Sequence, residues 1–117
     1  MNEPPSHATD YVAAWITAHR IEIGGTQLKI FRQEQYGRTY CAEFETARYL
    51  IQFCAWDHAN CLDIQALDKE SGSDAYMVVG DCDGDEGLSN RLDTFLHWLD
   101  LNEPNRDAEH VVGGNGG

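Results

Sequence analysis

The sequence predicts an α+β fold, an antiparallel meander of about five strands with an N-terminal and a C-terminal helix packed on one face. Apolar residues near both ends of the chain recur at helical spacing, the segments between them alternate apolar and polar residues, and brief turns join those segments. A chain of 117 residues has room for one domain, which we place at residues 1–101. Residues 102–117, polar and glycine-rich, are predicted to form a disordered tail.

The first predicted helix runs from about Asp10 to Ile23. Ser6 or Thr9 can cap its start, and the glycine pair after Ile23 ends it. One stripe of this helix is expected to be buried, and it consists of Val12, Trp15, Ile16, His19 and Ile23.

Five alternating segments follow, and we expect strands at 26–33, 38–45, 47–56, 61–68 and 75–80. Leu28 and Ile30 are expected to share a face of the first strand, and a turn is expected at Tyr36 and Gly37. The third strand has two apolar sides, one with Tyr49, Ile51 and Phe53 and the other with Leu50, Cys54 and Trp56. Because two helices on one face leave the other partly open, some aromatic surface is expected to be available to a partner.

An acidic loop is predicted at 81–87, before the second helix. The apolar stripe of that helix contains Leu88, Leu92, Phe95, Leu96 and Leu99, and the helix is expected to end near Leu101. The simplest interpretation of the loop, without a binding function, is a solvated segment whose carboxylates stabilise the N-terminus of the helix.

The charge is strongly negative, with 8 Lys and Arg against 20 Asp and Glu, or −12 overall. Such a chain repels phosphate backbones and anionic membrane surfaces, so neither nucleic acid nor membrane is expected as a partner. A basic protein or a cation is compatible with this charge. The charge also fits a simpler role, which is to keep a small protein in solution.

Four cysteines, at positions 41, 54, 61 and 82, accompany no visible export signal. We therefore expect reduced cysteines and a cytoplasmic protein. The longest apolar runs fall far short of the roughly 20 residues that a membrane helix needs.

The acidic loop also suggests calcium, because Asp81, Asp83 and Asp85 match the first, third and fifth positions of an EF-hand loop. However, Glu86 stands where the loop needs glycine, and Leu92 stands where it needs a bidentate glutamate. No metal and no cofactor are predicted, and a calcium-regulated interaction module is kept as the alternative function.

The other candidate groups of residues predict neither a zinc site nor a catalytic site. Cys54, His58 and Cys61 lack the closely spaced cysteine pair typical of zinc sites. The sequence has no nucleophile elbow, no phosphate-binding glycine loop and no zincin helix. We therefore predict a protein that is not an enzyme, with a small enzyme of unrecognised site and a structural subunit as further alternatives.

The aromatic candidate for an interface is Trp56, which ends the third strand beside two polar residues, because tryptophan is enriched at binding hot spots. Together with the acidic loop it predicts a surface that meets a basic partner. The predicted partner-binding residues are Trp56, Asp57, His58, Asp81, Asp83, Asp85 and Glu86.

Several segments resemble the TriTu family of bacterial immunity proteins. They are the arginine-led strand 47–56 that ends in Trp56, the strand 62–68 that ends in Leu-Asp, Glu70-Ser71-Gly72, and the helix 92–99. The first helix, with Trp15, Arg20 and Ile23, also fits. The turn Ala59-Asn60, Ala55 and the acidic loop depart from the family pattern.

The resemblance implies an immunity protein without a cofactor that binds and neutralises a cognate polymorphic toxin delivered by type VI secretion. The toxin implied is an ADP-ribosyltransferase acting on elongation factor Tu, inhibited by occlusion of its active-site cleft. A basic face on that toxin would suit the acidic chain, since opposite fields speed encounter.

Overall fold

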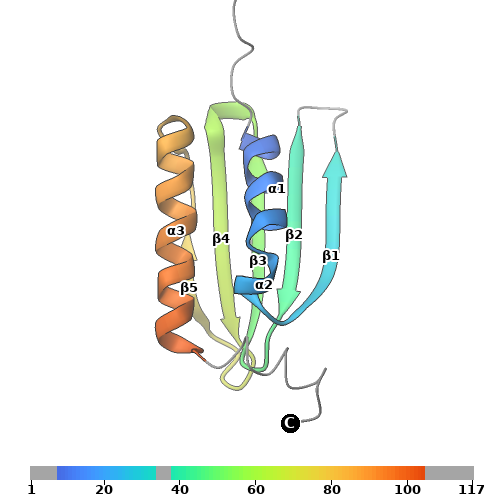
Figure 1. Cartoon of the computed structure of the whole chain (residues 1–117), viewed down its shortest axis with the longest axis vertical. Helices are drawn as coiled ribbons and strands as arrows, with labels where there is room; N and C mark the ends of the chain where they lie inside the picture. Colours follow the sequence, from blue (N-terminus) through green and yellow to red (C-terminus); the bar gives the residue numbers. More distant parts are fainter. Residues whose placement is uncertain (1–7, 34–37, 105–117) are drawn as a thin grey trace, which may run out of the picture.

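Five strands lie in sequence order, β1-β2-β3-β4-β5, in one fully antiparallel sheet (Figure 1). The computed structural model describes residues 8–33 and 38–104. The strands are β1 Thr26–Gln33, β2 Thr39–Glu45, β3 Tyr49–Trp56, β4 Cys61–Asp68 and β5 Asp74–Val78. The helices are α1 Ala8–Ala18, α2 Arg20–Ile23 and α3 Gly84–Asn102, with a 3-10 turn, η1, at His58–Asn60. The predicted α+β meander with terminal helices is confirmed.

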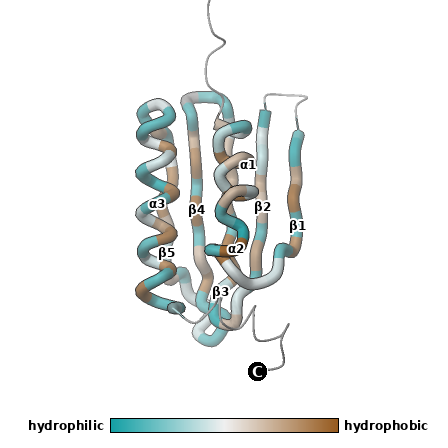
Figure 2. Tube along the Cα trace, viewed as in Figure 1, coloured by the Kyte–Doolittle hydropathy of each residue, from teal (hydrophilic) through white to brown (hydrophobic). Residues whose placement is uncertain are grey.

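The helices form a layer against one face of the sheet (Figure 1). Strict alternation along β2, β3 and β4 buries every second side chain beneath this layer. Aromatic rings occupy its centre, where Phe53 meets Phe44 and Phe95 edge to face at centroid distances of 6.1 and 5.5 Å. Hydrophobic residues recur among hydrophilic ones along α3 in Figure 2, as expected of a helix with one buried side. The core therefore lies wholly between the helices and one sheet face.

The first helix is divided in two, where a single helix was predicted. His19 leaves helical geometry with φ −108° and ψ 16°, and its ring stacks on Trp15 at 4.2 Å. The Trp15 carbonyl accepts the His19 backbone N–H and also contacts Nδ1 of its ring, both at 2.9 Å. Thr9, one predicted cap, lies inside the first turn, whereas Ser6 is outside the described residues.

A glycine is required where α2 turns into β1. Gly25 has φ +68°, and a Cβ on it would lie 2.4 Å from the carbonyl oxygen of Glu45. Any side chain there would collide with the backbone of β2, so the predicted glycine stop also sets how closely β1 approaches its neighbour.

Strand β1 is irregular at its start. A β-bulge between Gln27 and Lys29 inserts Leu28 as an extra residue. Leu28 then lines a hollow on the helix-free face, while Ile30 pairs with Ala42, whose side chain is buried beneath the helices. The prediction that Leu28 and Ile30 share a face is wrong, because the extra residue reverses the alternation.

The expectation of four reduced cysteines is also wrong. The register of β2 and β3 places Cys41 directly opposite Cys54, and a disulfide joins them. Cys61 and Cys82 are free thiols. Residues 41 and 54 are 13 positions apart in the sequence, and only the strand register brings their side chains together.

The chain packs further at its C-terminal end than predicted. Helix α3 begins at Gly84, inside the predicted acidic loop, and continues through Asn102. Glu103 is buried, and its Oε2 accepts the backbone N–H of Arg48 at 3.0 Å. The folded region thus passes the predicted boundary at residue 101. The rest of the predicted tail from residue 105, like the predicted turn at 36–37, lies outside the described residues.

In the described part of the chain, no helix combines the length and apolarity needed to cross a membrane.

Candidate partner-binding face

Within residues 8–33 and 38–104 the second face of the sheet carries no helix, and we call it the open face (Figure 1). Its side chains alternate with the buried ones along the strands and are partly or fully exposed. Large apolar residues are among them, with Leu50 37%, Met77 50% and Val79 60% exposed. Exposed apolar surface is therefore present on this side, and Trp56 is half-buried there. The open-face residues used below are Leu28, Glu43, Leu50, Gln52, Cys54, Trp56, Cys61, Asp63, Gln65, Leu67, Met77, Val79 and Asp81.

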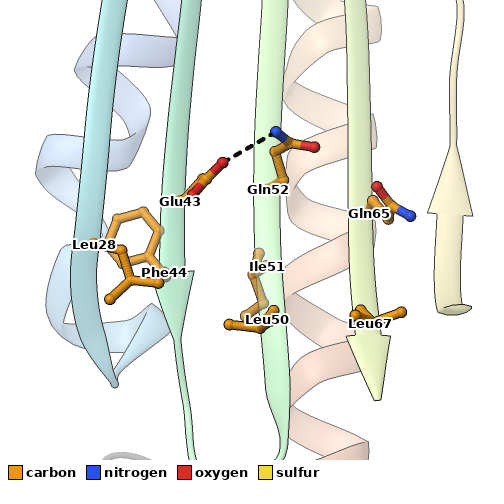
Figure 3. Close-up of a pocket in the computed structure, with 8 residues that line it drawn as sticks. All are labelled: Leu28, Glu43, Phe44, Leu50, Ile51, Gln52, Gln65 and Leu67. Carbon is orange, nitrogen blue, oxygen red and sulfur yellow. Dashed lines mark hydrogen bonds between the residues drawn. The ribbon is translucent and has the colours of Figure 1, made fainter. Parts of the chain in front are cut away.

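A first hollow of about 240 Å³ lies on β2, β3 and β4, toward the end of the sheet where β3 begins and β4 ends (Figure 3). Its apolar lining comes mainly from Leu28, Leu50 and Leu67, the last two being directly opposed across β3 and β4. Glu43 and two glutamines form its polar side. The bulge in β1 is what brings Leu28 to this hollow.

A second hollow of about 250 Å³ adjoins the first and shares Gln52 and Gln65 with it. Trp56, Met77 and Val79 are among its apolar lining residues, and Asp63 is its acidic one. The two glutamines are direct cross-strand partners, so they form a polar divide between two apolar depressions.

A third hollow, of about 310 Å³, lies where β3 ends and β4 begins. It is lined by Trp56, His58, Cys61, Asp63 and Asp81. An isolated bridge between Cys61 and Asp81 brings the acidic segment to this end of the open face. Three predicted partner-binding residues, Trp56, His58 and Asp81, therefore share one hollow.

Asp57 has a structural contact instead. Its Oδ1 accepts hydrogen bonds from the backbone N–H of Thr9 at 3.0 Å and from the Thr9 hydroxyl at 2.8 Å. Its Oδ2 lies 3.5 Å from Nε of Arg38, and only 16% of its side chain is exposed. The carboxylate thus satisfies a donor in the first turn of α1 and attaches that helix to the end of β3.

The remaining predicted acids lie around the start of α3. Asp83 precedes the helix, and Asp85 and Glu86 lie in its first turn. All three are exposed, and their charges are favourable at a helix N-terminus. Since α3 packs on the covered face, they do not line the hollows of the open face.

The side chain of Arg91 connects α3 to the sheet below this segment. Its Nη1 donates to the carbonyl oxygens of Leu62 at 2.7 Å and Gly80 at 2.9 Å. The Gly80 carbonyl also accepts the Leu62 backbone N–H at 3.0 Å. These contacts fix the position at which the acidic segment leaves the sheet.

Acids outnumber bases on the open face, where Lys29 on β1 lies directly opposite Glu43. Glu43, Asp63 and Asp81 line the hollows, and Asp74 adjoins them through Gln65. Lys69, at the far end of the sheet, is paired with Glu45 at 2.6 Å. The open face therefore combines apolar depressions with net negative charge.

The two free thiols are weak nucleophiles, because a raised pKa lowers the fraction present as thiolate. Burial, reinforced by the carboxylates of Asp63 and Asp81, raises the pKa of Cys61. Burial is also the main reason that the pKa of Cys82 is raised. Both groups are therefore mostly protonated thiols at neutral pH.

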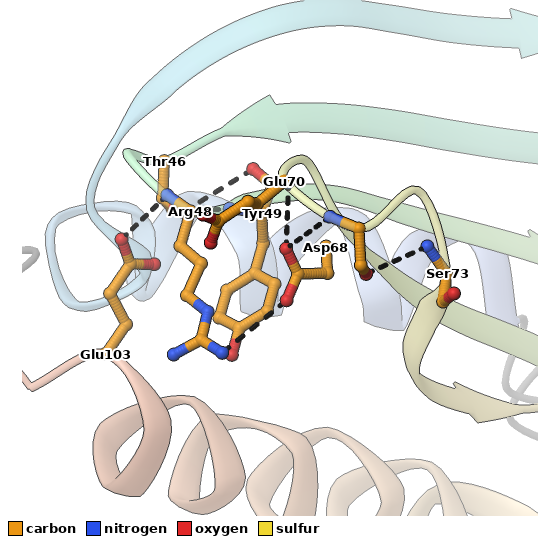
Figure 4. A network of polar contacts seen from close by, with 8 residues as sticks. Thr46, Arg48, Tyr49, Asp68, Glu70, Ser73 and Glu103 are labelled. Carbon is orange, nitrogen blue, oxygen red and sulfur yellow. Dashed lines mark hydrogen bonds and ion pairs between the residues drawn. The ribbon is translucent and has the colours of Figure 1, made fainter.

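At the opposite end of the sheet, polar contacts hold the β4–β5 turn (Figure 4). Asp68 Oδ1 accepts the backbone N–H groups of Glu70 at 2.9 Å and Ser71 at 3.3 Å, and Oδ2 lies 3.5 Å from Nη2 of Arg48. Those hydrogen bonds, with Arg48, lower the pKa of Asp68. This network is structural and lies away from the hollows.

Sequence reasoning missed Glu43, Gln52, Gln65, Asp63 and Asp74. Their alternation with buried residues was visible in the sequence, but their grouping depends on the register of four strands. Among the described residues, no three His, Cys, Asp or Glu side chains come together in a way that could hold a metal ion.

No protein-family model matches the chain, and no curated protein matches it.

Proposed function

We propose that this chain is a protein-binding module that neutralises a bacterial toxin by covering the toxin's active site with the open face. The observation that supports this proposal is the helix-free sheet face, which carries apolar hollows separated by a polar row and lined in part by acidic residues. Protein interfaces typically combine apolar contact surface with hydrogen-bonding polar groups.

The kind of partner follows from charge and from side-chain chemistry. An acidic face attracts a basic one and accelerates encounter, which matters when the partner is an enzyme already at work. Trp56 lies at the junction of two hollows, where a tryptophan can act as a hot spot. We therefore assign the docking role to Trp56, His58 and Asp81 together with Leu50, and not to Asp57.

The identity of the toxin comes from the TriTu resemblance alone. It makes the target an ADP-ribosyltransferase that modifies elongation factor Tu, and it puts the encounter in the cytoplasm, where that factor works. The Cys41–Cys54 disulfide removes the argument for this compartment that rested on reduced cysteines.

Growth rescue tests the proposal. An ADP-ribosyltransferase toxin domain that modifies elongation factor Tu is expressed from an inducible promoter, with wild-type chain or with Leu50→Lys. Leu50 is exposed and opposes Glu45, so lysine is tolerated there while it repels a basic partner. Thr94→Lys, on an exposed position of α3, adds the same charge on the covered side and is the matched control.

Wild type and Thr94→Lys are expected to restore growth and to keep elongation factor Tu unmodified, whereas Leu50→Lys fails. Failure of the wild-type chain to protect cells refutes the toxin-neutralising function. Equal protection by both lysine variants refutes the open face as the docking surface.

A further inference from the structure

A row of polar side chains crosses the centre of the open face. Glu43 on β2 pairs with Gln52 on β3, and Gln52 pairs with Gln65 on β4. Gln65 then contacts Asp74 at the start of β5. We call these four residues the acceptor row, and the first two hollows lie on its two sides.

The hydrogen bonds along this row fix the orientation of both amides. Gln52 Nε2 donates to Glu43 Oε2 at 3.3 Å, and Gln65 Nε2 donates to Asp74 Oδ1 at 2.7 Å. Because an ionised carboxylate only accepts hydrogen bonds, the NH₂ end of each amide must face it. Figure 3 shows the Gln52 oxygen turned away from Glu43, toward β4.

The consequence is a surface that offers acceptors. Each glutamine uses an N–H on its carboxylate and presents a carbonyl oxygen between Gln52 and Gln65, while Glu43 and Asp74 add oxygens and two negative charges. The oxygens and the two carboxylate charges of this row suit a cationic partner group that donates several hydrogen bonds.

We infer that the acceptor row binds an arginine side chain of the partner protein, and this inference rests on the proposed function. A guanidinium is planar, always charged and carries five N–H donors without an acceptor. Its aliphatic stem can lie in the adjoining hollow against Leu50 and Leu67, as long cationic side chains do on apolar surface. Lysine presents a compact, strongly hydrated charge and makes less use of a line of oxygens.

Charge separates this occupant from a second copy of the chain. Two copies would bring together open faces of the same negative sign, each belonging to a chain of net charge −12. An arginine-bearing segment supplies the opposite charge and the missing donors at once.

Peptide titration followed by NMR tests the inference without the toxin. The ¹⁵N-labelled chain is titrated with hexa-arginine and, separately, with hexa-lysine, which has the same charge. We expect hexa-arginine to bind about tenfold more tightly, since its extra charge-assisted bonds contribute on the order of 1.4 kcal/mol. The side-chain NH₂ signals of Gln52 and Gln65 should shift with it.

The double variant Gln52→Leu with Gln65→Leu removes the amide oxygens and leaves the charge unchanged. It is expected to bind both peptides equally, at the affinity that wild type shows for hexa-lysine. Gln27→Leu, on β1 outside the row, is the matched control and should keep the arginine preference. Circular dichroism verifies that each variant is folded.

Equal affinity of wild type for both peptides overturns the inference, as does an arginine preference that survives the double variant. Shifts confined to the start of α3 overturn it as well. Growth rescue measures protection from the toxin and does not depend on the outcome of the peptide titration. The inference and the proposed function can therefore fail separately.

Discussion

Replacing Asp57 by alanine should destabilise the fold, because two donors of Thr9 lose their acceptor. Thr9 is only 1% exposed, so its backbone N–H and hydroxyl, now bound at 3.0 and 2.8 Å, would be left buried. Hydrogen bonds to a charged group contribute about 1.5 kcal/mol or more each, which gives a loss of about 3 kcal/mol for Asp57→Ala. Asp57→Asn keeps an oxygen for Thr9 and loses the charge beside Arg38, so we expect about 1 kcal/mol.

Urea and thermal unfolding followed by tryptophan fluorescence measure both losses. For a domain of this size they correspond to decreases in Tm of about 15 °C and about 5 °C. Asp81→Ala is the matched control, since it removes the same charge from an exposed position and should change stability by less than about 0.5 kcal/mol. If Asp57→Ala unfolds like Asp81→Ala, the structural role given to Asp57 is refuted.

Three further perturbations test other contacts. Reducing the Cys41–Cys54 disulfide, or replacing both residues by alanine, should lower the free energy of unfolding by about 3 kcal/mol, and an unchanged urea midpoint would contradict this. Burial raises the pKa of Cys61, so this thiol should react with iodoacetamide at pH 7.5 much more slowly than it does in the unfolded chain. Mass spectrometry measures both rates, and equal rates would refute the lowered reactivity of the folded-state thiol. Asp68, whose pKa is lowered from 3.8, stabilises the fold above that pH, so wild type should lose its advantage over Asp68→Asn as the pH falls through 3.8 and below. A constant difference across that pH range would show that the carboxylate charge is not responsible.

Much of the fold could be predicted because most of its helices and strands follow from patterns of residues close together in the sequence. Alternation along β2, β3 and β4 and the helical stripe ending in Leu99 each depend on nearest neighbours in the sequence. The break at His19 and the bulge at Leu28 depend instead on contacts with particular neighbours. A pattern of apolar residues does not distinguish these from a straight helix and a regular strand.

The candidate site was less predictable, because it depends on register. Trp56 and Asp81 could be selected from their local sequence, one at the end of a predicted strand and the other in the acidic loop. Their meeting requires the bridge between Cys61 and Asp81. Gln52 and Gln65 carry no signal in the sequence, since isolated glutamines in strands are ordinary. Only the pairing of β2, β3 and β4 turns them into one row.

The acidic residues of the chain therefore include two kinds, those that stabilise the fold and those that shape the surface for recognition. Asp57 and Asp68 accept backbone hydrogen bonds inside the molecule, so removing them should change stability. Glu43 and Asp74 orient glutamines on an exposed face, so removing them should change recognition more than folding. A count of acidic residues treats all four alike, whereas their hydrogen-bond partners distinguish them. If the open face binds a basic partner, its affinity should follow the second pair and be insensitive to the first in any variant that is still folded.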